Sequence, residues 1–303
     1  MTEFLKLLLL LFVFMGLMAC NKNRDRIQLP VEQKPQYLFL GHIYNKENRI
    51  DPRLEQINYA AYKGVWLGGD LCSETTKERA TLDYLDDIFD LESEDTHWAV
   101  GNHDVRNGNL QWITEATGRD LFYTQQKDGI TIAVLDTNMG HVPGRNATCV
   151  EREEQSAFIQ NLVDTLQNTS HLVLLMHWVI WGEVDPTIPC RELSNNCLPT
   201  FQFICEEGSS RFPPFLYDKL IALEERGIEV IVLSGDGGIF TKGFHRETPE
   251  GIDFLISGIF STLDRNNPPT SVEVNLNPDS VLIFNHDTLA QRLTWEFVAL
   301  DDL

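Results

Sequence analysis

The stretch Trp98-Ala99-Val100-Gly101-Asn102-His103-Asp104 joins a short apolar run to a turn that carries polar side chains. Two other apolar runs end in the same way: residues 65–67 precede Gly68-Gly69-Asp70, and residues 172–176 precede His177. Short apolar runs that alternate with helical patterns are typical of an α/β layered fold. The stretch therefore predicts a strand that delivers polar groups to one edge of a sheet.

Five predicted strands end on a side chain that is able to bind a metal ion: His42, Asp70, Asn102, His177 and Asp236. Glycine precedes four of these residues, and glycine permits a tight exit from a strand. Ligands of open α/β sheets bind beyond the carboxyl ends of the strands, so the five side chains are expected to meet in one crevice. Imidazole, carboxylate and carboxamide groups together suit a divalent ion such as Mn, Zn or Fe.

Taken singly, each of these features has a simpler explanation. Gly-Asp and Gly-Asn-His-Asp are common turn sequences, and a histidine after a strand is more often a hydrogen-bonded loop residue. Five such features in chain order favour a shared site over coincidence.

The rest of the chain continues the alternation. Further strands are predicted at residues 37–40, 129–135, 228–233, 252–256, 281–284 and 293–298. Helices are predicted at about residues 75–90, 151–166 and 214–226, and Asp51-Pro52 has the capping residue and first-turn proline of another. Residues 182–212 hold three cysteines and lack periodicity, which predicts either an insertion over the crevice that shapes specificity or a decorative loop.

These motifs resemble those of the calcineurin-like metallophosphoesterases, whose signature is DxH, GD, GNH[DE], a lone histidine and GHxH, each after a strand. Gly69-Asp70 and Gly101-Asn102-His103-Asp104 match in full, and the resemblance covers about residues 36–300. It implies a four-layer α/β/β/α sandwich with two mixed β-sheets. It also implies a metal-dependent hydrolase of phosphate mono- or diesters.

Two motifs depart from the family pattern. The DxH position is Leu40-Gly41-His42, and the GHxH position is Gly235-Asp236-Gly237-Gly238. The resemblance then implies one strong metal site formed by Asp70, Asn102, His177 and Asp236. The second site keeps only His42 and Asp70 and is weakened, so His42 either binds a second ion weakly or hydrogen-bonds the phosphate.

The resemblance assigns the catalytic roles to the GNHD motif: His103 is the general acid, and Asp104 orients it. Two alternatives remain beside a phosphoesterase. One is a catalytically impaired lipoprotein that keeps the fold as a binding or scaffold protein, and the other is a hydrolase of a different ester. The missing aspartate and histidine favour the scaffold, whereas the retained GGD, GNHD and His177 favour the enzyme.

The amino-terminal segment is predicted to be an export signal. Residues 7–18 form an uncharged run that is short for a membrane span, and Leu17-Met18-Ala19-Cys20 resembles a bacterial lipobox. The predicted organisation is a signal peptide at 1–19, lipidated Cys20 and a tether at 20–35, and the phosphoesterase domain at 36–303. This predicts a lipid anchor in the bacterial cell envelope, periplasmic or surface-exposed; the simpler alternative is an ordinary signal peptide.

Composition excludes several other classes. A hydrophobic content of 43% excludes a wholly disordered chain. Because 45 acidic residues face 24 basic ones, for a net charge of −21, nucleic-acid binding by general electrostatics is not expected. The expected partners are a phosphate-ester substrate and, through the lipid anchor only, a membrane.

Overall fold

The computed structural model describes residues 34–139, 142, 144–181, 185, 187–189, 192–195, 214–260 and 277–303. One compact unit covers Lys34–Leu303. The predicted signal peptide, Cys20 and the tether as far as residue 33 lie outside the described residues, so these stay predictions. None of the described helices has the length and apolarity that crossing a membrane requires.

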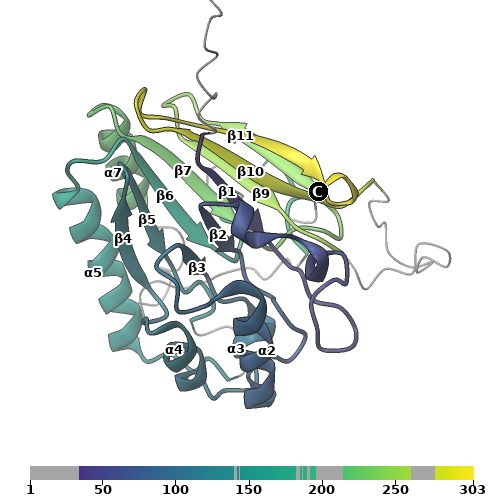
Figure 1. Cartoon of the computed structure of the whole chain (residues 1–303). Coiled ribbons are helices and arrows are strands. Elements are labelled where there is room, and N and C mark those ends of the chain that lie inside the picture. Colours follow the sequence, from purple (N-terminus) through teal and green to yellow (C-terminus); the bar gives the residue numbers. More distant parts are fainter. Residues whose placement is uncertain are drawn as a thin grey trace, which may run out of the picture. The chain divides into compact units, whose positions relative to one another are not determined.

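Two mixed β-sheets form the centre of this unit (Figure 1). In the first sheet, of order β11-β10-β1-β2-β3, strands β1, β2 and β3 are parallel and β10 and β11 pair antiparallel. Its strands are β1 (Gln36–Leu40), β2 (Gly64–Leu67), β3 (Thr96–Trp98), β10 (Ser280–Asp287) and β11 (Arg292–Ala299). The parallel strands β1 to β3 deliver the loops that follow them to one edge.

The second sheet has the order β4-β5-β6-β7-β9-β8. Its four inner strands are parallel, and the edge strands β4 and β8 pair antiparallel. The strands are β4 (Tyr123–Lys127), β5 (Ile130–Val134), β6 (His171–Met176), β7 (Glu229–Ser234), β8 (Gly243–Glu247) and β9 (Asp253–Ser257). This sheet therefore also gathers the ends of its inner strands at one edge.

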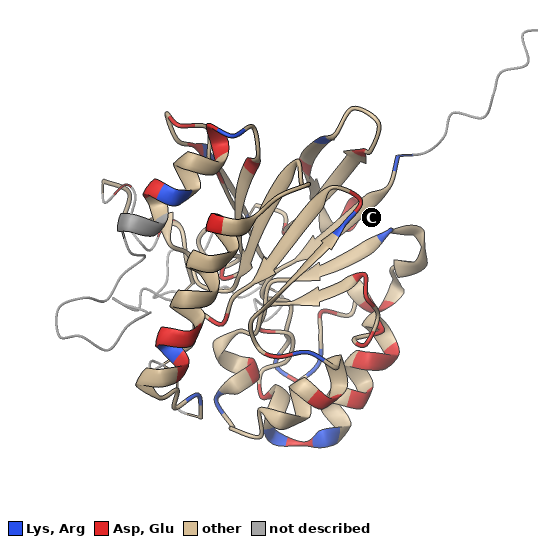
Figure 2. Ribbon diagram, turned by 90° about the vertical axis from the view of Figure 1, so that its left-hand side faces the viewer, with Lys and Arg blue, Asp and Glu red and all other residues tan. Residues whose placement is uncertain are grey.

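Helices cover the outer face of each sheet. They are α2 (Arg79–Phe89), α3 (Asn102–Val105), α4 (Gln111–Thr117), α5 (Cys149–Thr165) and α7 (Pro214–Glu224), with short 3₁₀ helices at Leu54–Gln56, Tyr59–Ala61, Thr75–Lys77 and Leu300–Asp302. Helix α5 begins with a capping box between Thr148 and Glu151. Charged residues gather on the helices and loops, whereas the middles of the inner strands are free of them (Figure 2).

Three hydrophobic cores separate the layers. In β1, Tyr37 and Phe39 pack between the two sheets, while Leu38 and Leu40 pack beneath α2 and α4. A third core joins the second sheet to α5 and α7. Because both faces of the inner strands are buried, they are continuous apolar runs rather than alternating ones. The predicted four-layer α/β/β/α sandwich with two mixed sheets is confirmed.

The structure differs from the sequence-based elements in a few places. The edge strands β4 and β8 were not expected, because their Gln, Lys, Arg and Glu side chains hide the strand pattern. The helix expected at Asp51-Pro52 is only the 3₁₀ turn Leu54–Gln56. The Asp51 carboxylate accepts hydrogen bonds from the backbone N–H of Arg53 at 2.9 Å and from its guanidinium, which favours a turn.

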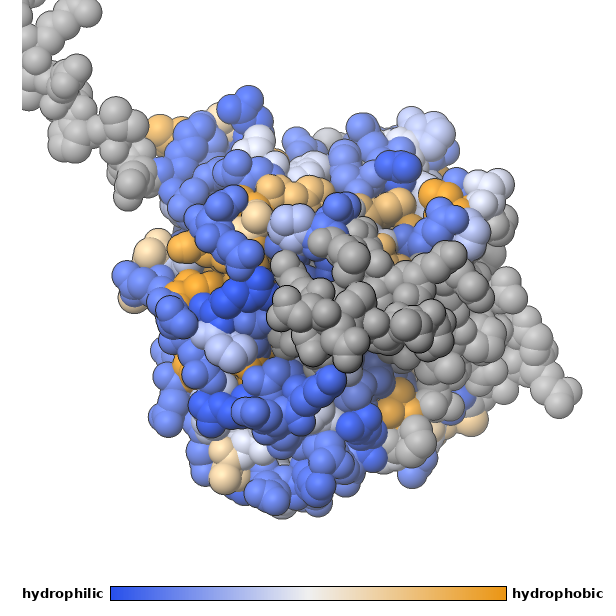
Figure 3. All heavy atoms as spheres, turned by 90° about the vertical axis from the view of Figure 1, so that its right-hand side faces the viewer, coloured by the Kyte–Doolittle hydropathy of each residue, from blue (hydrophilic) through white to orange (hydrophobic). Residues whose placement is uncertain are grey.

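The described surface is largely polar. Its large exposed hydrophobic residues are Val150, Leu289, Phe297 and Leu303. On the face drawn in Figure 3, the described hydrophobic residues are scattered among hydrophilic ones. Cys72 is free and buried, and Cys149 forms a disulfide whose partner lies outside the described residues.

Candidate metal centre

Glycines bring the carboxyl ends of the two sheets into backbone contact. A Cβ atom built on Gly235, after β7, would lie 2.1 Å from the carbonyl oxygen of Gly68, after β2. A Cβ on Gly41, after β1, would lie 2.6 Å from the carbonyl oxygen of Gly235. Both distances are shorter than any tolerable contact, so only glycine lets these loops meet. His42 and Asp236, which follow Gly41 and Gly235, therefore start from this point of contact.

Two of the predicted site residues have a left-handed backbone. His42 has φ = 49° and Asp70 has φ = 55°. This conformation is uncommon for residues with a side chain, and it persists where the surrounding structure enforces it. Here the backbone N–H of His42 is hydrogen-bonded to the carbonyl oxygen of Gly69 at 3.0 Å, which ties the two loops together.

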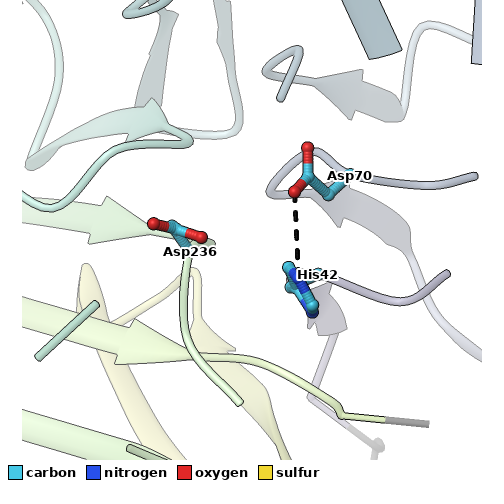
Figure 4. A group of neighbouring side chains, drawn as sticks. All are labelled: His42, Asp70 and Asp236. Atoms are coloured by element: carbon cyan, nitrogen blue, oxygen red, sulfur yellow. Dashed lines mark ion pairs between the residues drawn. The ribbon is translucent and has the colours of Figure 1, made fainter. Parts of the chain in front are cut away.

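His42, Asp70 and Asp236 form a buried cluster (Figure 4). One potential ligand atom from each lies within 4.8 Å of the other two. Nε2 of His42 is 3.8 Å from Oδ2 of Asp70, and Asp236 reaches the cluster from the second sheet. Nε2 of His177 lies 3.5 Å from Oδ2 of Asp70 and 3.7 Å from Oδ1 of Asp236. The centre therefore takes residues from both sheets.

The hydrogen bonds of the two histidines define which ring nitrogen faces the centre. Nδ1 of His42 is bonded to the carbonyl oxygen of Ile259, and Nδ1 of His177 to that of Gly68, both at 2.8 Å. A carbonyl oxygen can only accept, so Nδ1 carries the hydrogen in each ring. In the neutral rings both Nε2 atoms then present lone pairs to the centre, which is the tautomer of a metal ligand.

The carboxylate of Asp70 has the arrangement typical of a metal ligand, with one oxygen hydrogen-bonded to the protein and the other facing the centre. Its Oδ1 accepts the backbone N–H of His103 at 2.8 Å, whereas its buried Oδ2 accepts no hydrogen bond from the described residues. Burial alone would raise the pKa of this carboxyl, but positive charge on His177, His103 and His42 reverses the effect and lowers it. With the rings neutral, a metal ion would have to supply that positive charge. A buried carboxylate oxygen facing two imidazole lone pairs calls for a cation between them. The residues present therefore fit a divalent metal ion.

Asn102 completes the set that the sequence predicted. Its Oδ1 lies 3.2 Å from Nε2 of His177. The structure thus brings His42, Asp70, Asn102, His177 and Asp236 together at the carboxyl ends of β1, β2, β3, β6 and β7.

The GNHD motif is arranged differently from the expectation for its last residue. Asp104 does not orient the His103 ring, because Nδ1 of His103 is bonded to the carbonyl oxygen of Ser73 at 2.9 Å. Instead the buried Asp104 carboxylate accepts hydrogen bonds from three backbone N–H groups and one hydroxyl. The donors are Asp70 (2.8 Å), Leu71 (3.0 Å), Gly101 (2.8 Å) and Thr75 (2.6 Å). Asp104 therefore shapes the loop that carries Asp70.

The altered motifs place an apolar side chain at one position and a blocked glycine at another. Leu40, which stands at the DxH position of the motif comparison, is buried in the core beneath α2. Gly238 has φ = +116°, and a Cβ atom there would lie 2.5 Å from the carbonyl oxygen of Ile259. The backbone of Ile259 thus occupies the space that a side chain at position 238 would need.

Sequence reasoning missed two residues at the centre. Tyr44 stacks on His103, and Ser194 donates a hydrogen bond to Asp236. Tyr44 lies two residues after His42, and this closeness in the sequence was the one feature that could have marked it as a site residue. Ser194 belongs to a segment without periodicity, so no pattern in the sequence marks it.

Comparison with known proteins adds little to this geometry. No family model and no curated protein matches the sequence. Among solved structures, a phosphopantetheinyl hydrolase from Mycobacterium tuberculosis is 14% identical, with a TM-score of 0.47 and coverage of 82% of this chain and 98% of that chain. A dimetal phosphatase from Danio rerio is 12% identical, with a TM-score of 0.46 and coverage of 89% and 97%. Likenesses of this size carry no functional argument, so function rests on the centre itself.

Proposed function

We propose that this chain is a metal-dependent hydrolase of phosphate mono- or diesters and a divergent relative of the calcineurin-like metallophosphoesterases. The observation that carries the proposal is the buried Oδ2 of Asp70, which faces Nε2 of both His42 and His177. Asp70, Asn102, His177 and Asp236 would hold the ion, with His42 at its edge. When bound, the ion supplies charge neutralisation for the phosphoryl group and lowers the pKa of a water ligand.

The remaining roles belong to the chain's own residues. His103 follows the ligand Asn102 and is held by Ser73 through Nδ1, so Nε2 is the atom left to hand a proton to the leaving oxygen. Asp104 keeps the Asp70 loop in its left-handed turn. The expected metals are Mn, Zn or Fe, because the donor set mixes imidazole with carboxylate and amide oxygens.

The test measures metal content and turnover on the full chain purified in detergent. After equilibration with Mn²⁺ or Zn²⁺ and removal of loose metal, we expect about one tightly bound ion. Asn102→Ala should lose most metal-dependent hydrolysis of a phosphodiester and phosphomonoester panel. Asn161→Ala, an exposed substitution on α5, is the matched control and should keep both metal and activity.

A second candidate function is that of a non-catalytic binding or scaffold protein. It is favoured by the backbone of Ile259, which leaves no space for a ligand side chain at position 238. A folded wild-type chain that binds no ion would exclude the hydrolase and leave the scaffold. An ion bound without turnover on phosphate esters, but with turnover on other esters, would indicate a different hydrolase. Full activity in Asn102→Ala would contradict the assignment of the site.

We also propose that Cys20 is acylated and anchors the chain in a bacterial envelope. The support is the position of Cys20 at the end of the apolar run 7–18. Metabolic labelling with a fatty acid should mark the wild type and not Cys20→Ser. Equal labelling of the two chains would contradict the anchor.

A further inference from the structure

The segment Glu192, Leu193, Ser194 and Asn195 lies between β6 and α7 and is fastened to the loop that follows β7. The backbone N–H of Asn195 donates to the carbonyl oxygen of Asp236 at 2.9 Å, and its side-chain amide donates to that of Gly237 at 2.6 Å. In return, Oδ1 of Asn195 accepts the backbone N–H of Ile239 at 2.7 Å. The hydroxyl of Thr241 donates to the carbonyl oxygen of Glu192.

One contact of this segment reaches the metal centre itself. The hydroxyl of Ser194 donates a hydrogen bond to Oδ2 of Asp236, and both side chains are buried. The other carboxylate oxygen, Oδ1, lies 3.7 Å from Nε2 of His177. Ser194 therefore holds one oxygen of Asp236, while the other faces His177 at the centre.

Other side chains of the centre likewise have one polar atom hydrogen-bonded to the protein and the other facing the centre. His42 and His177 are each held through Nδ1 and present Nε2. Asp70 is held through Oδ1 and presents Oδ2. An imidazole or carboxylate ligand that is fixed through its second polar atom loses less rotational freedom when it binds an ion, which strengthens the site.

We infer that Ser194 is a positioning residue for the metal ligand Asp236, so that the segment carrying it is part of the metal centre and not a decoration. The inference rests on the proposed function only in taking Asp236 as a ligand. Asp236 stands where the related family has a histidine. A histidine ligand can be held by a hydrogen bond through the ring nitrogen that does not bind the ion, and Ser194 holds Asp236 in the same way, through its second carboxylate oxygen.

The test measures the affinity of the full chain in detergent for Mn²⁺ alone, by calorimetry or by electron paramagnetic resonance of free Mn²⁺. Ser194→Ala should weaken binding by about 10- to 100-fold, as removal of a hydrogen bond to a ligand typically does. Ser194→Thr keeps the hydroxyl and should bind nearly as the wild type. If Ser194→Ala does not fold, Ser194→Cys preserves the volume with a weak donor and should show the same loss.

Thr241→Val is the matched control. It removes a hydroxyl from the same contact between the segment and the loop without touching the Asp236 carboxylate. Unchanged Mn²⁺ affinity in this variant supports the inference. An equal loss in Thr241→Val and Ser194→Ala would overturn it in favour of a general loosening of the loop.

Two further outcomes are distinguishable. Wild-type affinity in both Ser194→Ala and Ser194→Cys would overturn the role of Ser194 and leave the proposed function standing. A folded wild-type chain that binds no Mn²⁺ would overturn both.

Discussion

The hydroxyl of Tyr44 lies 3.3 Å from Nε2 of His103, and the two rings stack with their centroids 4.4 Å apart. Since Nδ1 of His103 is bonded to the carbonyl oxygen of Ser73, Nε2 is the nitrogen left for proton transfer. The loop after β1 therefore contributes a hydroxyl to the proposed general acid as well as His42 to the metal centre.

Tyr44→Phe keeps the stacked ring and removes the hydroxyl from His103. Loss of one such hydrogen bond, about 1 to 1.5 kcal/mol, should lower kcat about tenfold for phosphate esters with poor leaving groups. Esters of acidic nitrophenols need little protonation and should be hydrolysed at nearly the wild-type rate. Tyr59→Phe is the control, because its hydroxyl donates to Leu54 away from the centre. An equal loss for both classes of ester would contradict this role.

Gly235→Ala should destabilise the protein strongly. The new methyl group would lie 2.1 Å from the carbonyl oxygen of Gly68, and the backbone has to move apart to admit it. We expect a loss of about 3 kcal/mol in the free energy of unfolding, measured by denaturant titration. Gly118→Ala is the comparison: its φ of +64° costs about 1 kcal/mol, but no atom lies within 4 Å. Similar losses in the two variants would show that the sheets separate easily.

His97 should make the protein sensitive to acid. Burial lowers its pKa to about 4 from the ordinary 6.5, and Arg119 adds to the effect, while Asp95 opposes it. Between these values the unfolded chain binds a proton that the folded chain does not, so stability is lost as pH falls from about 6.5 to about 4. The loss amounts to at most about 3 kcal/mol.

His97→Gln should remove this part of the pH dependence. Comparing each protein with itself at pH 7.5 and pH 4.5 cancels the packing change caused by the substitution. If both proteins lose the same stability between the two pH values, the acid sensitivity comes from other groups.

Gly238→His should fail to rebuild a second metal site. Its left-handed φ and the carbonyl oxygen of Ile259 at 2.5 Å oppose any side chain there. We expect a less stable protein that still holds about one ion, measured by elemental analysis after gel filtration. Two tightly bound ions in this variant would show that the loop adapts to the histidine.

Much of the fold was predictable because the inner strands are buried on both faces. β1, β2 and β6 therefore appear in the sequence as apolar runs, and the polar residues that end them mark the edge where the sheets meet. The edge strands β4 and β8 escaped prediction because solvent permits polar side chains on them. Local pattern thus failed at these two edge strands, although it predicted the edge strand β11.

The composition of the centre was predictable, but its internal contacts were not. Asp104 was expected to orient its neighbour His103, yet its partners include Asp70 and Leu71, more than thirty residues earlier in the chain. Ser194 lies forty-two residues before Asp236. Motifs identify residues that share a turn, whereas contacts between distant turns depend on how the two sheets dock.

The proposed metal ligands come from both sheets: His42, Asp70 and Asn102 from the first, His177 and Asp236 from the second. An ion bound among them would link the two sheets. At a free metal concentration of a hundred times the Kd, binding would add about 2.7 kcal/mol to the free energy of unfolding. The lifetime of the protein would then follow the supply of metal to the cell. A metal-starved cell would lose the protein itself to proteolysis as well as its activity.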